Sequence, residues 1–214
     1  MKGPPLFSEL PCFNKATLST LIDKKGEGLN YWIKRLLSLG VVIPLKNGFF
    51  VSQDFLTKIS GQAALRDRYV EYLSSVMRQP SYLSLEYCLS KQGLIPEMPR
   101  SITAITVKSP RRFSNALGSF VYRNIKEILF TGYREETFLD KSYYCATPAK
   151  ALFDFIYLTR FDTRSFERQL EETLRINWDF LDKKSLKELE KYVQLSGKRK
   201  MEKFLEIIVK RGLI

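Results

Sequence analysis

The sequence predicts an α+β fold in which a small helical module with a β-hairpin precedes a mixed α/β domain with a small sheet and a helical C-terminal part. Three observations predict this class: two amphipathic segments followed at once by a hairpin signal, short β-prone runs between residues 102 and 146, and helical periodicity from residue 147 onward. The 214 residues are 44% apolar, which is enough to bury a sizeable core. The expected divisions are a first domain at residues 1–60, a linking helix at residues 61–79 and a second domain at residues 80–214.

Two helices are expected in the N-terminal module. Residues 14–23 have apolar positions near helical spacing, and Asn14 is a suitable N-cap because its side chain can accept a hydrogen bond from a backbone N–H. The charged, glycine-containing residues 24–28 interrupt this pattern. A second helix is expected from Leu29, with Gly40 in the position of a C-terminal cap. Its apolar stripe, which we expect to face the core, consists of Leu29, Trp32, Ile33, Leu36 and Leu37.

A β-hairpin is expected directly after the second helix, over residues 41–52. Its two β-prone runs meet at Asn47-Gly48, a strong hairpin signal because a type I′ turn needs positive φ at both central residues. Pro44 cannot donate a hydrogen bond to a neighbouring strand, so its strand should lie at a sheet edge. Helix, turn, helix and hairpin in this order predict a winged helix-turn-helix.

The outer face of the second helix has side chains suited to a DNA groove. Asn can make two hydrogen bonds with adenine, whereas Lys and Arg can reach guanine acceptors or phosphates. If the apolar stripe faces the core, the residues expected to contact DNA from this helix are Asn30, Tyr31, Lys34 and Arg35. Lys46 and Asn47, at the hairpin tip, would lie against the sugar-phosphate backbone. The same charges are typical of any solvated helix, and helix-turn-helix modules also mediate protein–protein interactions, so both alternatives stay open.

The overall charge favours a polyanionic partner. Lys and Arg number 35 against 23 acidic residues, a net charge of +12, which attracts nucleic acid or anionic lipid at long range. The sequence has no signal-peptide pattern and no apolar run of about 18 residues. We therefore expect a cytoplasmic protein without a membrane partner.

The absence of one residue type weakens the case for an enzyme. The sequence contains no histidine, the usual general base and the commonest metal ligand. Cys12, Cys88 and Cys145 are far apart and form no CxxC pair, so neither a disulfide framework nor a zinc site is expected. We expect a non-enzymatic protein with no catalytic residues, no metal and no cofactor.

The second domain is expected to combine short strands with helices. A short helix is expected at residues 84–91, and strands are expected at residues 102–108, 120–125, 136–139 and 142–146. Thr147 as N-cap and Pro148 at the first helical position then predict a helix. Residues 163–214 have the pattern of three amphipathic helical pieces, broken near residues 177–182 and 196–198.

Several short motifs of the second domain occur in the order and spacing of a known family. They are Tyr82, Ser84, Leu85 and Glu86 at the start of a short helix, Gly-Leu-Ile-Pro at residues 93–96, a strand ending in threonine and basic residues, and Pro148, Lys150, Ala151, Leu152 and Asp154 at the start of a later helix. Together with the N-terminal module, these motifs make residues 13–160 resemble the AbiEi antitoxin family of type IV toxin–antitoxin systems, which act in abortive phage infection.

The resemblance implies an antitoxin that represses its own operon. Its winged helix would bind double-stranded promoter DNA with inverted repeats, and its second domain would supply antitoxicity and assist repression. The implied functional partner is a nucleotidyltransferase toxin encoded beside it, without a stable complex between the two.

Two further groups of residues have both a functional and a structural interpretation. A second basic patch, or else a set of solvated charges, would be formed by Lys108, Arg111, Arg112, Arg123 and Lys126. Lys150 and Asp154 are expected to serve helix start and packing, because a pair four residues apart with the lysine first contributes only about 0.3 kcal/mol.

Two other functions stay open beside the antitoxin. A stand-alone winged-helix transcriptional regulator would use the N-terminal module without a toxin partner. A metal-dependent nuclease would use carboxylates such as Asp140 or Asp154, although no strand has the acidic and lysine pattern of such a site. A nucleotidyltransferase gene next to this one would favour the antitoxin.

Overall fold

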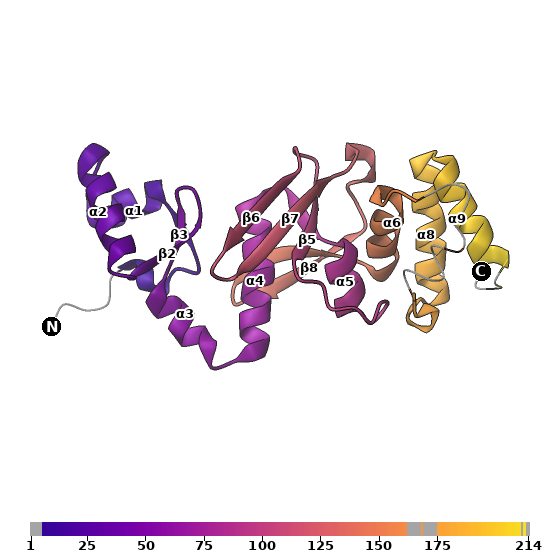
Figure 1. Cartoon of the computed structure of the whole chain (residues 1–214), viewed down its shortest axis with the longest axis horizontal. Coiled ribbons are helices and arrows are strands. Elements are labelled where there is room, and N and C mark those ends of the chain that lie inside the picture. Colours follow the sequence, from indigo (N-terminus) through magenta and orange to yellow (C-terminus); the bar gives the residue numbers. More distant parts are fainter. Residues whose placement is uncertain (1–5, 162–167, 169–174, 211, 213–214) are drawn as a thin grey trace.

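The computed structural model describes residues 6–161, 168, 175–210 and 212 and has the expected α+β class. Within these residues it contains eight α-helices, a three-stranded antiparallel sheet near the N-terminus and a six-stranded mixed sheet. Figure 1 shows the N-terminal module at one end, the larger sheet in the middle and the last helices at the other end. None of the helices in this described part is both long and apolar enough to cross a membrane.

The N-terminal module contains the two helices and the hairpin that the sequence predicts. Its elements are η1 (Leu6–Glu9), β1 (Phe13–Asn14), α1 (Lys15–Ile22), α2 (Gly26–Ser38), β2 (Val42–Lys46), β3 (Phe49–Ser52) and α3 (Gln53–Ser60). The Asn14 side chain accepts from the Thr17 N–H, as expected of the N-cap of α1. Gly48 has φ 68° in the hairpin turn. The sheet order β1-β3-β2 places β2, with Pro44, at an edge.

One face of this module forms a small core of its own. The buried side chains are Phe7, Phe13, Leu18, Ile33, Val42 and Phe50. Ile33 is 6% exposed, as expected for the inner face of α2, but the prediction that Trp32 belongs to the core is wrong, because Trp32 is 39% exposed. The reason is helical geometry: at about 100° per residue, Trp32 is rotated away from the centre of the stripe that Ile33 defines.

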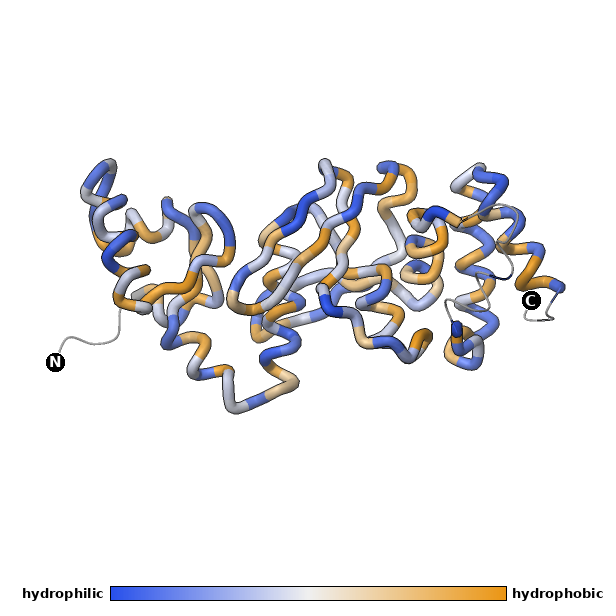
Figure 2. Tube along the Cα trace, viewed as in Figure 1, coloured by the Kyte–Doolittle hydropathy of each residue, from blue (hydrophilic) through white to orange (hydrophobic). Residues whose placement is uncertain are grey.

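The central domain is a mixed sheet with helices on both faces. Its elements are α4 (Ala63–Met77), β4 (Ser81–Leu83), α5 (Leu85–Lys91), β5 (Ile102–Thr106), β6 (Arg111–Asn115), β7 (Gly118–Asn124), η2 (Glu127–Leu129), β8 (Tyr133–Phe138), β9 (Lys141–Ala146) and α6 (Pro148–Leu158). The strand order is β6-β7-β5-β4-β9-β8, with parallel pairing of β5 to β7 and of β4 to β9. Figure 2 shows hydrophobic stretches running through the interior of this domain.

Adjacent residues of β7 show which helices cover which face of this sheet. The Tyr122 hydroxyl donates to the Ser74 carbonyl of α4, whereas the Arg123 guanidinium donates to the Leu158 carbonyl at the end of α6. Because neighbouring side chains in a strand point to opposite faces, α4 and α6 lie on opposite faces of the sheet. The helix expected at residues 61–79, which is α4, therefore packs on one face of the central sheet as well as connecting the N-terminal module to the central domain.

The helical C-terminal part packs against α6. It contains η3 (Trp178–Phe180), α8 (Lys183–Ser196) and α9 (Arg199–Lys210), with the expected break near residues 196–198. The first of the three expected pieces, from residue 163, lies largely outside the described residues. Lys200 of α9 donates to the carbonyls of Tyr157 and Thr159 at 3.0 and 2.8 Å, so it satisfies acceptors that the end of α6 leaves open.

Lys150 and Asp154 form a fully buried ion pair, as a role in packing requires, but the pair is not the weak contact that helix spacing alone suggests. Both side chains are 0% exposed, and the Lys150 ammonium lies 2.6 Å from Asp154 Oδ1. The other carboxylate oxygen accepts from the Tyr82 and Ser84 hydroxyls at 2.9 and 2.8 Å. The physical reason is the packing of α8, whose Tyr192 ring lies 5.2 Å from the ammonium and helps to exclude water.

Burial opposes the charge on both members of the pair. It raises the pKa of Asp154 and lowers the pKa of Lys150, and the attraction between the two groups acts in the opposite direction for each. Removing one partner would leave an unpaired charge in the core, a far larger cost than the loss of a surface contact.

We predict that Asp154→Ala lowers the free energy of unfolding by about 3–5 kcal/mol, because the Lys150 ammonium would lose its buried partner. Asp140→Ala is the matched control, since Asp140 is exposed in the turn between β8 and β9. Urea titration followed by circular dichroism measures both. Equal effects of the two changes would contradict a structural role for the buried pair.

Candidate nucleic-acid interface

The outer face of α2 carries the four helix residues that the sequence predicts for DNA contact. Asn30, Tyr31, Lys34 and Arg35 are all exposed. Among the described residues, the side chains of Asn30, Lys34 and Arg35 make no hydrogen bond or ion pair. Their donors and acceptors are therefore available to an external partner.

The same helix exposes an aromatic pair beside the cations. Tyr31 is 59% exposed, and its ring packs edge-on against Trp32 with 6.3 Å between the centroids. Leu39, just after the helix, is 64% exposed. The outer face of α2 thus presents aromatic as well as cationic side chains, with Tyr31 between Lys34 and Arg35. A periodicity argument that assigns Trp32 to the core misses part of this aromatic surface.

The hairpin provides one of its two predicted contacts in an accessible position. Asn47 is exposed at the turn, but Lys46 points away from it. The Lys46 ammonium donates to the Met77 carbonyl at 2.6 Å and lies 5.3 Å from the Phe49 ring. Burial, together with the charges of Arg78 and Lys108, lowers the pKa of Lys46. The expected position of Lys46 at the exposed tip is wrong, because its long side chain finds a buried acceptor on α4.

Further contacts fix the N-terminal module on the central domain. The Asn115 amide donates to the Leu45 carbonyl at 3.0 Å, and the Tyr69 hydroxyl donates to the Pro11 carbonyl at 2.7 Å. Side chains from the hairpin and α3, namely Leu45, Val51, Phe55 and Ile59, are buried in the same cluster as the central core. The α2 surface is therefore held in a defined position relative to the larger sheet.

The predicted second basic patch is divided by the strand register. Arg111 pairs with Tyr122 and Arg112 with Val121, so the two arginines point to opposite faces of the sheet. The Arg123 guanidinium donates to the Leu158 carbonyl at 2.6 Å. Lys108, before β6, and Lys126, after β7, are both exposed. Consequently the five residues do not form one cationic face.

A concentration of lysines on α8 was missed by the sequence analysis. Lys183, Lys184, Lys187 and Lys191 line a hollow of about 450 Å³ together with Glu188. Spacings of three and four residues in this lysine-rich stretch are the signal that could have revealed it, because such residues share one side of a helix.

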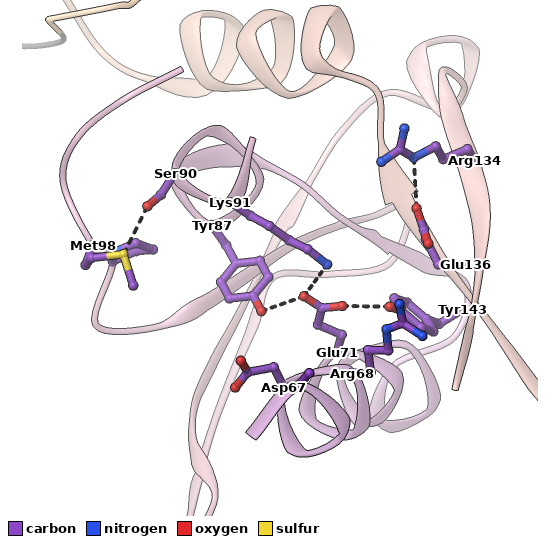
Figure 3. Close-up of a pocket in the computed structure, with 12 residues that line it drawn as sticks. Asp67, Arg68, Glu71, Tyr87, Ser90, Lys91, Met98, Arg134, Glu136 and Tyr143 are labelled. Carbon is purple, nitrogen blue, oxygen red and sulfur yellow. Dashed lines mark hydrogen bonds and ion pairs between the residues drawn. The ribbon is translucent and has the colours of Figure 1, made fainter. Parts of the chain in front are cut away.

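A second hollow, of about 580 Å³, was missed as well (Figure 3). It lies between α4, α5 and the β8–β9 hairpin, and its floor contains Glu71, which is 1% exposed. The Glu71 carboxylate accepts from the Tyr87 and Tyr143 hydroxyls at 2.8 and 2.6 Å and from the Lys91 ammonium at 2.6 Å. Helical spacing gives no sequence signal for this site, because Glu71 lies on the face of α4 away from the apolar stripe that contains Tyr69, Tyr72 and Leu73. Its three donors are 16 to 72 residues distant in sequence.

The carboxylates considered for a nuclease do not share a site. Asp140 pairs with Lys141 on the surface, whereas the Asp154 carboxylate is buried and bonded to three side chains. In the part of the chain that the structure describes, no group of three or more Cys, Asp or Glu side chains is arranged to hold a metal ion.

Comparison with known proteins adds no assignment: no protein-family model matches the chain, and no curated protein sequence matches it either. The resemblance to the antitoxin family therefore stands on the motifs alone.

We predict that Lys34→Ala combined with Arg35→Ala weakens binding to the DNA upstream of its own gene and reduces the salt dependence by about one counterion per lost phosphate contact. Gel-shift titration at several salt concentrations measures this. Lys58→Ala, at an exposed position in α3 outside both α2 and the hairpin, is the control. Unchanged affinity in the α2 variant would exclude this face as the DNA contact.

We predict the opposite pattern for Lys46→Met. The ammonium serves the Met77 carbonyl, so its loss should lower the melting temperature while leaving the salt slope of DNA binding unchanged. Thermal unfolding and the same gel-shift series measure the two quantities. A smaller salt slope with an unchanged melting temperature would instead indicate that Lys46 contacts DNA.

Proposed function

We propose that this chain is a DNA-binding autorepressor and the antitoxin of a type IV toxin–antitoxin system. The observation that carries the DNA-binding part is the outer face of α2, where Asn30, Lys34 and Arg35 are exposed without intramolecular side-chain partners among the described residues. A helix with this composition can enter the major groove, where Asn and Arg distinguish base pairs by their hydrogen-bonding pattern.

The order of elements supports a winged helix-turn-helix. α1 and α2 are followed by the β2–β3 hairpin, and β1 pairs with β3 to complete a three-stranded sheet. In this arrangement α2 is the recognition helix and the hairpin with Asn47 is the wing beside the sugar-phosphate backbone. The net charge of +12 supports association with DNA at long range. Inverted repeats in the promoter would present one half-site to each of two copies of the chain.

The antitoxin part of the proposal depends on the family resemblance. Two of the motifs that carry it, around Tyr82 and Ser84 and around Lys150 and Asp154, are joined by hydrogen bonds in the central domain. The residue types in these two motifs suit one buried network, which supports the proposal that the motifs belong together in one domain. The proposed functional partner is a nucleotidyltransferase toxin without a stable complex, and the proposed location is the cytoplasm.

A stand-alone transcriptional regulator is the second candidate. The exposed face of α2 supports it equally, because that surface concerns DNA and not the toxin. Co-expression with a neighbouring nucleotidyltransferase gene separates the two candidates.

We predict that the full-length chain rescues growth of cells that express the neighbouring nucleotidyltransferase, and that Lys34→Ala with Arg35→Ala keeps this rescue while releasing a promoter–reporter fusion from repression. Point variants are preferable to deletion of residues 1–60, because Leu45, Val51 and Phe55 belong to the main core. Both genes should be expressed from inducible promoters, so that protein levels stay equal. Repression without rescue by the unaltered chain would favour the stand-alone regulator.

A further inference from the structure

The hollow above Glu71 has the construction of a small-molecule site. Its lining comes from three directions: α4, the α5 region with the following loop, and the β8–β9 hairpin (Figure 3). Its volume of about 580 Å³ is within the range of pockets that bind small ligands. The lining residues Ala64, Asp67, Arg68 and Glu71 recur at spacings of three and four, so one face of α4 forms an entire wall.

Glu71 holds the floor of the pocket in a fixed geometry. A buried carboxylate requires hydrogen-bond donors, and Glu71 has them from Tyr87, Tyr143 and Lys91. Burial raises the pKa of both tyrosines, and the Glu71 carboxylate raises it further, so the hydroxyls remain protonated donors at neutral pH. Glu71 thus positions the Lys91 ammonium, and the Lys91 side chain is still 43% exposed.

Donors and an acceptor remain for a ligand around this floor. The Lys91 ammonium has three N–H groups and donates one of them to Glu71. Arg68 and Asp67 are exposed and make no hydrogen bond or ion pair with the described residues. Arg134 and Glu136, at the rim, are paired with each other at 2.9 Å. The available groups are therefore cationic at Arg68 and Lys91 and anionic at Asp67.

The distribution of charge selects a dipolar ligand. The lining contains the cations Arg68, Lys91 and Arg134 and the acids Asp67, Glu71 and Glu136, which balance formally. A balanced site does not favour a simple anion or a simple cation, but separated charges favour a molecule that has both. In Figure 3 Asp67 and Arg68 point to different sides of Glu71, and the Lys91 ammonium lies above the Glu71 carboxylate.

An apolar part of the wall completes the site. Met98 lines the pocket and is 86% exposed, with its sulfur 3.5 Å from the Ser90 hydroxyl. Pro99, Ala64 and the Tyr87 ring add further apolar surface. An apolar group placed here would remove the exposed Met98 side chain from water, which is favourable.

We propose that this pocket binds a small dipolar ligand of the amino-acid class with an apolar side chain. Arg68 and Lys91 hold its carboxylate, Asp67 holds its ammonium group, and Met98 and Tyr87 cover its side chain. This binding site goes beyond the proposed DNA and toxin functions and does not depend on them.

The experiment titrates the full chain with L-leucine by calorimetry and follows the methyl resonance of Met98 by NMR. L-leucine should bind saturably and shift that resonance. Isocaproate lacks the amino group and isoamylamine lacks the carboxylate, and each should bind at least about tenfold more weakly, because one charged hydrogen-bonding group is lost.

Variants locate the ligand in the pocket. Arg68→Ala and Asp67→Asn should each weaken L-leucine binding at least about tenfold. Arg66→Ala is the matched control, because Arg66 is exposed on α4 but does not line the pocket, and it should leave binding unchanged. Circular dichroism verifies that all three variants fold.

Three results would overturn the proposal. One is the absence of a saturable signal with L-leucine, L-methionine and L-phenylalanine. Another is isocaproate binding as tightly as L-leucine, which would make the pocket a simple anion site. The third is binding that Arg68→Ala and Arg66→Ala affect equally, which would place the ligand elsewhere. None of these results would bear on DNA binding by α2.

Discussion

The buried ion pair between Lys150 and Asp154 is the constraint on which the central domain depends. Two charges removed from water destabilise a protein unless each has partners, and here the partners come from β4, the start of α5 and α6 itself. Tyr192 of α8 then covers the ammonium. One pair therefore fixes the relative positions of a strand and three helices. It also gives Tyr82, Ser84, Lys150 and Asp154 a structural role, since all four are fully buried.

The position of the N-terminal module follows from the same domain. α4 covers the sheet and presents the Met77 carbonyl, which captures the Lys46 ammonium at 2.6 Å. Asn115 of β6 and Tyr69 of α4 make further hydrogen bonds to this module. The outer face of α2 is thus presented by a body that includes the central sheet. A DNA duplex bound to α2 would therefore have a fixed orientation relative to the central domain. The N-terminal module and the central domain would then not move independently of each other.

The charged residues of the chain are distributed over separate surfaces with different chemistry. Lys34 and Arg35 are exposed without partners among the described residues, as a surface for a polyanion requires. The lysines on α8 form a second cationic region, at the other end of the molecule (Figure 1). The hollow above Glu71 is lined by equal numbers of cationic and acidic side chains. The net charge of +12 conceals these differences, because a sum over the chain does not distinguish paired from available groups.

Features that depend on neighbours within about four residues could be predicted from the amino-acid sequence alone. The Asn14 cap, the Asn47-Gly48 turn and the Thr147-Pro148 helix start follow from local hydrogen bonding and backbone conformation, so the class of the fold and the exposed face of α2 could be predicted. The surroundings of Lys46, Glu71, Arg111 and Asp154, in contrast, follow from tertiary packing. Their partners or sheet faces are set by residues far away in the chain: Lys46 bonds 31 residues away and Asp154 bonds 72 residues away. The Lys150–Asp154 pair, weak by helix spacing alone, is fully buried, and the expected DNA contact Lys46 instead joins the N-terminal module to α4. Both outcomes depend on what packs around a residue and not on its neighbours in sequence.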